Sequence, residues 1–263
     1  MASPSPLLLE QSTVNLVEIF SAIQGEGLNV GTRQIFIRFG GCDLRCHFCD
    51  SAHTWTAKPT CQIEQSPGLR DFVTHQNPVT LPQILQWLNA QDQPGLHDSI
   101  SLTGGEPLLH AAFLAVLLPR IRHQTQLPLY LETGGHHPDA LAQLLPYLDS
   151  VGMDLKLPSV SGESHWDQHG RSLEQCHQAA VDVFCKLIIS AQTQWSDLVT
   201  AAQLVADINP TIPIFLQPVT PLSAHHPVQP PTPSQVLTWQ SDLKQICPHI
   251  RVIPQTHKFM GQL

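Results

Sequence analysis

Three cysteines stand within eight residues of one another, in the run Cys42-Asp-Leu-Arg-Cys46-His-Phe-Cys49. Three thiolates at this spacing can hold one face of a cubic 4Fe–4S cluster, each binding a different iron. The fourth iron then has no protein ligand, and an open metal position is where a substrate or cosubstrate can coordinate. The spacing therefore predicts a reactive iron–sulfur centre.

Structural zinc is the alternative for the same cysteines, with His47 or His53 as a fourth ligand. Such zinc sites usually combine two closely spaced ligand pairs with a longer gap between them. A single C-x3-C-x2-C run lacks that pattern, which favours the cluster. The remaining cysteines are scattered, and we expect them to be small buried side chains: Cys61, Cys176, Cys185 and Cys247.

The composition of the 263-residue chain limits its partners. Its formal net charge is −8, from 13 Lys and Arg against 21 Asp and Glu. Binding to nucleic acid needs a basic face that neutralises phosphates, so the charge argues against a nucleic-acid partner. No apolar run approaches the ~20 residues of a membrane span, and residues 1–13 lack the basic region of a signal peptide. We therefore expect a cytoplasmic protein with no membrane partner.

Short apolar runs alternate with amphipathic stretches, which is typical of an α/β fold. The expected strands cover residues 14–20, 34–39, 99–102, 129–132, 150–154, 184–189, 214–217 and 250–253. The expected helices cover residues 81–90, 107–122, 138–148, 173–182, 196–208 and 233–246. Alternating elements of this kind pair their strands in parallel through right-handed crossovers. About six βα units follow the cysteines, which predicts an incomplete (partial) TIM-type barrel.

The chemistry of such folds lies at the carboxyl ends of the strands. Cys42, Gly104 and Gly134 each follow an expected strand, and Gln217 ends one, so we expect them at one edge of the sheet. The domain prediction is a flexible N-terminus over residues 1–13 and a single domain over residues 14–263. Two proline-containing segments are expected to be peripheral loops: 53–78 and 218–233.

The cysteine run resembles that of the radical S-adenosylmethionine (SAM) superfamily. Phe48, the aromatic residue before the last cysteine, is typical of it, and so is Gly-Gly-Glu-Pro at 104–107. In this superfamily the latter loop receives the methionine amino group, and glycine allows the backbone to approach a ligand closely. Three more motifs are similar to the 7-carboxy-7-deazaguanine synthase family: Ile-Gln-Gly-Glu-Gly at 23–27, Phe-Ile-Arg-Phe-Gly-Gly-Cys at 36–42 and Pro-Gln-Thr-His-Lys at 254–258.

The resemblance implies a lyase of queuosine and 7-deazapurine biosynthesis. It converts 6-carboxy-5,6,7,8-tetrahydropterin to 7-carboxy-7-deazaguanine with loss of ammonia. The implied cofactors are a 4Fe–4S cluster, SAM and Mg²⁺. Reductive cleavage of SAM gives a 5′-deoxyadenosyl radical that removes the C6 hydrogen of the pterin, while the protein positions and shields the reactants. A homodimer and an electron donor of flavodoxin or ferredoxin type are further expectations from the family.

The resemblance also implies roles for individual residues. The expected cluster ligands are Cys42, Cys46 and Cys49. The expected SAM contacts are Phe48, Asp50, Gly105, Asp154, Leu155, Lys156, Gln217, Pro218, Val219 and Thr220. The expected pterin contacts are Ile23, Gln24, Gly25, Arg38, Thr103 and Leu263. Ser51 stands where the family has a magnesium-binding Thr, and its hydroxyl still suits a hard, oxygen-seeking ion.

Two of these positions, and Gly134 beside them, carry an argument of their own. The guanidinium of Arg38 offers the substrate carboxylate a planar bidentate partner; the alternative is a surface salt bridge. Leu263 stands where relatives often end in proline. The side chain therefore differs from the family, but the terminal carboxylate can still contact the pterin. Gly134 stands where relatives often have Asn, and glycine can adopt the same positive-φ turn.

The 15 histidines include the adjacent pairs 136–137 and 225–226. Both pairs lie next to proline in expected loops, and adjacent side chains on a regular element point apart. We therefore expect both pairs to be solvent-facing polar residues. His257 lies within the 254–258 motif and is expected to shape the substrate pocket.

Two other functions remain open at this point. A glycyl-radical activating enzyme shares the cysteine run and the 104–107 loop, but it acts on a protein backbone and gives no reason for the 23–27 and 254–258 motifs. A non-catalytic iron–sulfur or zinc protein is the other alternative. An electron carrier needs a fully ligated cluster, whereas this motif offers three cysteines, so the sequence favours the radical SAM enzyme.

Overall fold

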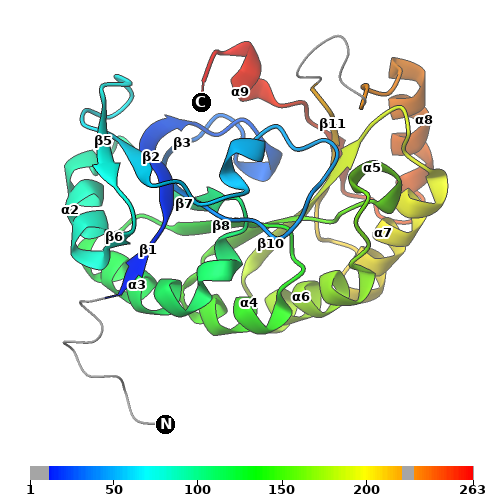
Figure 1. The fold of residues 1–263 in the computed structure, drawn as a ribbon. Helices are drawn as coiled ribbons and strands as arrows, with labels where there is room; N and C mark the ends of the chain where they lie inside the picture. The colour runs from blue at the N-terminus through cyan, green and yellow to red at the C-terminus, as the bar shows by residue number, and fades with distance from the viewer. Residues whose placement is uncertain (1–11, 221–227, 263) are drawn as a thin grey trace.

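The computed structural model describes residues 12–220 and 228–262, and its centre is a ten-stranded sheet. The strand order is β12-β11-β10-β9-β8-β7-β3-β2-β4-β5. A separate small sheet pairs β1 (Thr13–Val14) with β6 (Val79–Thr80). The large sheet curves, and the longer helices lie along its outer side (Figure 1).

Seven strands of the large sheet run parallel to one another. They are β3 (Arg33–Phe39), β7 (Ser99–Gly104), β8 (Leu129–Thr133), β9 (Ser150–Asp154), β10 (Asp182–Ile189), β11 (Ile214–Pro218) and β12 (Ile250–Val252). Each matches a predicted strand to within two residues at either end. The described sheet ends at β12 on one side and β5 on the other. The parallel strands therefore form a partial TIM-type barrel, as predicted.

The other side of the sheet differs from the prediction. β2 (Leu16–Ile23) pairs antiparallel with β3 and parallel with β4 (Thr60–Glu64), which pairs antiparallel with β5 (Phe72–Gln76). The prediction of one strand over 14–20 was therefore wrong in its bounds. The prediction of a loop over 53–78 was wrong for β4 and β5, because this segment extends the sheet.

The helices follow their strands in the order expected for βα units. They are α2 (Leu81–Gln91), α3 (Ala111–Gln124), α4 (Pro138–Leu144), α5 (Pro158–Ser161), α6 (Trp166–Gln178), α7 (Trp195–Ile208), α8 (Pro233–Leu243) and α9 (Thr256–Phe259). Short 3₁₀ turns are η1 (Gly27–Asn29), η2 (Ala52–Thr54), η3 (Pro107–His110) and η4 (Leu145–Tyr147). Thr80 and Thr232 begin α2 and α8 with capping boxes, which satisfy backbone N–H groups of the first turn.

Four predicted helices differ from the structure by more than one residue at an end, and one of these, predicted over 233–246, ends as α8 at Leu243. The segment 107–122 begins as η3 before α3, and the segment 138–148 ends as η4 after α4. The prediction of a helix over 173–182 was wrong at both ends, since α6 runs from Trp166 to Gln178.

The core lies between the sheet and these helices. Leu102, Leu131 and Leu187 of three parallel strands are fully buried, as are Leu117 of α3 and Leu198 of α7. The four scattered cysteines are buried as predicted: Cys61, Cys176, Cys185 and Cys247. Every helix in the described part of the chain is too short or too polar to cross a lipid bilayer.

Candidate active site

A cavity of about 520 Å³ opens at the carboxyl ends of the parallel strands. Its lining comes from the ends of β3, β7, β8 and β9, from β10, from the cysteine loop and from the C-terminal segment. The sequence-predicted residues that line it are Ile23, Gln24, Gly25, Arg38, Cys42, Cys46, Phe48, Cys49, Asp50, Ser51, Thr103, Gly105, Asp154, Lys156 and His257. Segments far apart in the sequence thus contribute to one site, as the strand topology led us to expect.

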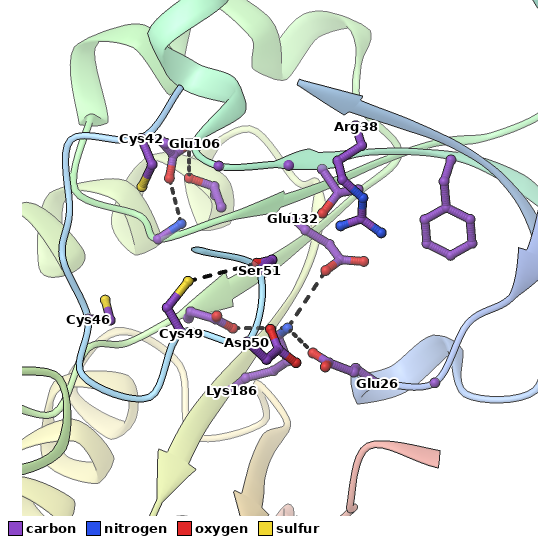
Figure 2. A pocket seen from close by; sticks show the side chains of 18 of the residues that line it. Glu26, Arg38, Cys42, Cys46, Cys49, Asp50, Ser51, Glu106, Glu132 and Lys186 are labelled. Atoms are coloured by element: carbon purple, nitrogen blue, oxygen red, sulfur yellow. Dashed lines mark hydrogen bonds and ion pairs between the residues drawn. The ribbon is translucent and has the colours of Figure 1, made fainter. Parts of the chain in front are cut away.

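The three cysteines of the motif face this cavity from one loop between β3 and η2, with Cys49 and Ser51 side by side (Figure 2). All three thiols are free. The Arg45 side chain donates to the Cys42 carbonyl at 2.8 Å and holds the loop. Burial raises the pKa of the Cys42 thiol to about 11 and also raises the pKa of Cys46. Iron must therefore displace protons when it binds these sulfurs.

The Gly104-Gly105 turn packs against the cysteine loop through its backbone. Gly104 has a φ of +139°, and a Cβ on Gly105 would lie 2.1 Å from the Gly41 carbonyl oxygen. The two N–H groups that follow, of Gly105 and Glu106, donate to Phe39 O at 3.0 Å and Gly41 O at 2.9 Å. Glycine is required here because the loop that carries Cys42 occupies the space of a side chain.

The Glu106 carboxylate joins the β7 end to the β8 end. It accepts hydrogen bonds from Leu108 N at 3.0 Å, from the Thr133 hydroxyl at 2.8 Å and from Gly134 N at 2.8 Å. The side chain is almost fully buried. Its role in this structure is therefore to fix the two loops that flank the cysteines.

A buried lysine and three acidic side chains lie together in the cavity wall (Figure 2). The Lys186 Nζ lies 2.7 Å from Glu26 Oε2, 3.1 Å from Asp154 Oδ1 and 3.8 Å from Glu132 Oε2. Burial alone would lower the pKa of Lys186, but the three carboxylates outweigh it and raise the pKa well above its ordinary value. The lysine is charged, and it compensates the acidic groups around it.

The pKa values of the three acidic side chains in this cluster are shifted in different directions. Burial raises the pKa of Glu26 and of Asp154, but nearby positive charge outweighs it and holds both pKa values below their ordinary values. At Glu26 this charge is Lys186, and at Asp154 it is Lys156 followed by Lys186. Burial raises the pKa of Glu132, which is farther from the lysine. Glu132 also accepts a hydrogen bond from Gln24 at 2.7 Å. The site therefore offers hydrogen-bond acceptors of graded basicity to a ligand.

The C-terminal segment closes one side of the cavity. Thr256 N donates to the Gly25 carbonyl at 2.9 Å, which binds this segment to the 23–27 motif. Asp50 Oδ2 accepts from Lys258 at 2.7 Å and from Gln255 at 2.8 Å. Burial raises the pKa of Asp50, but Lys258 outweighs it and holds the pKa below its ordinary value.

Arg38 both forms an ion pair and lines the cavity. Its Nε lies 2.7 Å from Glu18 Oε1, and its guanidinium stands 5.4 Å from the centre of the Phe20 ring. Arg38 is the register partner of Thr103 across β3 and β7. Arg38 therefore forms a salt bridge and also lies in the site, because its partner Glu18 is part of the same cavity wall.

Five sequence-predicted residues are not among the described residues that line the cavity: Leu155, Gln217, Pro218, Val219 and Thr220. Leu155 is buried in the core, and the other four form the end of β11 and the two residues after it. Leu263 and the pair at 225–226 lie outside the described residues. The prediction of a solvent-facing His136 was wrong, since only 7% of its surface is exposed, whereas His137 is partly exposed.

Sequence reasoning did not place Lys186, Glu26 and Glu132 among the site residues. Glu26 lies inside the 23–27 motif, and Glu132 ends a predicted strand. Lys186 carried a signal of its own, since it is a charged residue within the apolar run of β10. A lysine there must find compensating carboxylates inside the fold.

Comparison with known proteins identifies the family of the chain. The pattern of the Radical SAM superfamily matches residues 36–191. A 7-carboxy-7-deazaguanine synthase of Geobacter sulfurreducens is 42% identical, over 94% of this chain and 97% of the relative. One from Methanothermobacter thermautotrophicus is 31% identical, over 94% and 96%. The crystal structure of QueE from Escherichia coli has the same fold, with a TM-score of 0.61 at 19% identity over 97% of this chain and 99% of that chain.

These similarities favour the predicted family over a glycyl-radical activating enzyme and over a non-catalytic iron–sulfur or zinc protein. The relatives match along almost the whole chain. The chain belongs to the 7-carboxy-7-deazaguanine synthase family of the radical SAM superfamily.

Proposed function

We propose that this enzyme, a radical SAM lyase, converts 6-carboxy-5,6,7,8-tetrahydropterin to 7-carboxy-7-deazaguanine at the cavity described above. The observation that carries the assignment to this cavity is that three free thiols, the Gly104–Gly105 turn and Arg38 face one enclosed space. Incubation of the anaerobically reconstituted, reduced protein with SAM and the carboxylated pterin tests it. The expected products are the deazaguanine and ammonia, whereas SAM cleavage without either product would contradict the substrate.

The donor set fits the cluster of the family. Cys42, Cys46 and Cys49 are free, belong to one loop and face the same space, and each is a soft sulfur ligand of the kind that iron–sulfur clusters use. When bound, the cluster supplies the electron that cleaves SAM and so starts hydrogen abstraction from the substrate. The protein's own part is to hold the reactants in position and to exclude water from them.

For SAM we propose the contacts carried over from the family: Phe48, Asp50, Gly105, Asp154, Leu155, Lys156, Gln217, Pro218, Val219 and Thr220. Lys156 lies 3.1 Å from Asp154 and stands 5.5 Å from the centre of the Phe48 ring. Burial lowers the pKa of Lys156, but Asp154 outweighs it and keeps the ammonium charged. A fixed cation beside the cysteine loop suits a ligand with a carboxylate.

For the pterin we propose Ile23, Gln24, Gly25, Arg38, Thr103 and the carboxylate of Leu263. The Nε of Arg38 bonds Glu18, and the outer edge of the guanidinium, with both Nη groups, can take the substrate carboxylate in a bidentate manner.

Arg38→Met tests this assignment. A hydrogen-bonded charge pair contributes about 1.5–3 kcal/mol, so kcat/KM for the pterin is expected to fall by about 10- to 150-fold. SAM cleavage in the absence of pterin is expected to persist. The matched control is Arg122→Met, which removes an exposed ion pair with Asp149. An unchanged kcat/KM in Arg38→Met would remove Arg38 from the substrate site.

We further propose that Ser51 binds a magnesium ion next to the substrate. Ser51 lines the cavity, and its hydroxyl lies 3.9 Å from the Cys49 sulfur, so an ion held there would stand beside the reacting groups. A hydroxyl oxygen is a suitable ligand for Mg²⁺.

Ser51→Ala and Ser51→Thr test the magnesium site as a pair. The Mg²⁺ concentration that gives half-maximal product formation is expected to rise about tenfold or more in Ser51→Ala, the loss of one coordinating oxygen being equivalent to about 1.4 kcal/mol. In Ser51→Thr it is expected to stay near that of the unchanged protein. Equal Mg²⁺ dependence in all three proteins would contradict the site.

The enzyme acts on a small molecule in the pathway to queuosine. We also propose that it works in the cytoplasm, since seven free cysteines suit a reducing compartment. A flavodoxin or ferredoxin type electron donor and a homodimeric state remain proposals from the family. Sedimentation velocity and turnover with each purified donor are the direct measurements.

A further inference from the structure

A second group of metal-ligand side chains comes from the cysteine loop and the loop before α4, outside the described lining of the cavity. Asp43 directly follows Cys42, while His136 and His137 precede α4. His136 Nε2 lies 3.0 Å from Asp43 Oδ1, and His137 Nε2 lies 2.9 Å from Asp43 Oδ2. All three ligand atoms lie within 4.8 Å of one another. His136 Nε2 is hydrogen-bonded to Asp43 Oδ1, whereas His137 Nε2 is buried beside Asp43 Oδ2 without a hydrogen bond.

The single proton of a neutral His136 ring cannot satisfy both carboxylates beside it. Its Nδ1 is buried without a hydrogen-bond partner and lies 3.8 Å from Glu106 Oε2. A neutral imidazole carries one proton, so one of its nitrogens presents a lone pair to a carboxylate in either tautomer. A cation at Nε2 removes this conflict, because the proton then stays on Nδ1 and points toward Glu106. Metal-bound histidines usually donate their other N–H to a carboxylate or carbonyl in this way.

The glycine at position 134 makes room for this ring. A Cβ on Gly134 would lie 2.9 Å from His136 Nδ1 and 3.3 Å from Glu106 Oε2. A side chain as large as the Asn expected there from the family would displace the imidazole from Glu106. The glycine at position 134 therefore allows the buried position of the His136 ring.

The ligand chemistry selects the class of ion. Two imidazole nitrogens and one carboxylate suit zinc and similar divalent transition metals, whereas Mg²⁺ prefers a shell of oxygens. Tetrahedral zinc with bonds of about 2.1 Å separates its ligands by about 3.4 Å. The observed separations of 2.9 and 3.0 Å need to open by a few tenths of an ångström. The exposed side of Asp43, 42% of that side chain, admits water as the remaining ligand.

We propose that Asp43, His136 and His137 bind one zinc-type divalent ion, separate from the cluster. The ion joins the loop that carries Cys42 to the loop between β8 and α4. Its role is structural, since it fixes the cysteine loop through side chains outside the described lining of the cavity.

Zinc analysis of the holoenzyme tests the site. The cluster-loaded protein is equilibrated with ZnCl₂, desalted anaerobically, and its iron and zinc are measured by mass spectrometry. We expect one zinc per chain. Its extended X-ray absorption fine structure should contain a nitrogen and oxygen shell at about 2.0–2.1 Å and no sulfur shell at about 2.3 Å. His137→Ala is expected to retain its iron and to lose at least about 90% of the zinc, since even outer partners of a metal site change affinity 10- to 100-fold.

Asp43→Asn is the second variant, because it keeps the shape of the side chain and removes its charge. It is expected to weaken zinc binding at least about tenfold. The matched control is His177→Ala, which removes an exposed histidine of α6 and is expected to leave the zinc content unchanged. Each of three results would overturn the proposal: a wild-type protein without zinc, a sulfur shell around the zinc, or variants His137→Ala and Asp43→Asn that retain as much zinc as the wild type.

Discussion

Cys46→Ala is expected to lower reductive cleavage of SAM by about 1,000-fold or more, which corresponds to about 4 kcal/mol in activation free energy. Cys46 is the middle thiol of the loop and is 8% exposed, so no side chain outside the loop can replace it without rearrangement. Two remaining sulfurs cannot hold three irons of a cubic cluster. The measurements are iron per chain after anaerobic reconstitution and 5′-deoxyadenosine formed after reduction.

The control for this variant is Cys176→Ala. Cys176 is fully buried in α6, and its removal changes the number of thiols and the packing but not the cysteine loop. It is expected to retain both iron and SAM cleavage. A Cys46→Ala protein with a full iron content and unchanged cleavage would contradict the assignment of the ligands. A colourless, zinc-loaded protein without cleavage in the unmutated chain would contradict the radical chemistry itself.

The parallel strands from β3 to β11 could be predicted from the sequence because they are largely buried on both faces and read as short apolar runs. β9 has the predicted bounds, and the other six parallel strands differ by two residues or fewer at either end. Since each motif follows one of these strands, the strand ends also placed the motifs at one edge of the sheet. Much of the site could therefore be predicted from the order and direction of the strands.

The β4–β5 hairpin escaped prediction because its strands depend on their neighbours. Thr60–Glu64 and Phe72–Gln76 are short and largely polar, and the segment also contains Pro and Gly. β4 is held by two register pairs with β2, and β5 pairs with β4 alone in the described sheet. Edge strands of this kind lack the apolar run that identifies a buried strand.

The start of α6 was missed for a different reason. Its first turns pack through polar side chains: His169 Nε2 lies 3.0 Å from the Gly134 carbonyl, and the Ser172 hydroxyl donates to the Gly135 carbonyl at 2.8 Å. Both side chains are fully buried. An apolar periodicity cannot reveal a helix face that is buried through hydrogen bonds to a loop.

Lys186→Met is expected to destabilise the protein by about 3–5 kcal/mol, because it leaves buried carboxylates without their compensating charge. Methionine keeps most of the length and volume of the side chain. The Lys186 side chain is 4% exposed, and its ammonium lies within 2.7–3.8 Å of Glu26, Asp154 and Glu132. Anaerobic urea unfolding, followed by circular dichroism, measures the change. Lys244→Met, at an exposed position after α8, is the control and is expected to change stability by less than about 0.5 kcal/mol.

The pH dependence of that loss separates charge compensation from packing. In the unmutated protein, Lys186 holds the pKa of Glu26 below its ordinary value, so this contribution to stability is present above the unfolded pKa and disappears as the pH falls through the folded pKa. Without the lysine, burial raises the pKa of Glu26, as it already does for Glu132. The folded variant then binds more protons than its unfolded chain, and acid stabilises it.

The stability gap between the two proteins should therefore narrow as the pH falls from neutrality toward the carboxyl range. Asp154 contributes less to this narrowing, because Lys156 still lies 3.1 Å from it. A gap of the same size at every pH would mean that Lys186 stabilises the protein by packing alone. A narrowing gap assigns its effect to charge, and it makes Lys186 the group that keeps the acidic wall of the cavity ionised for a ligand.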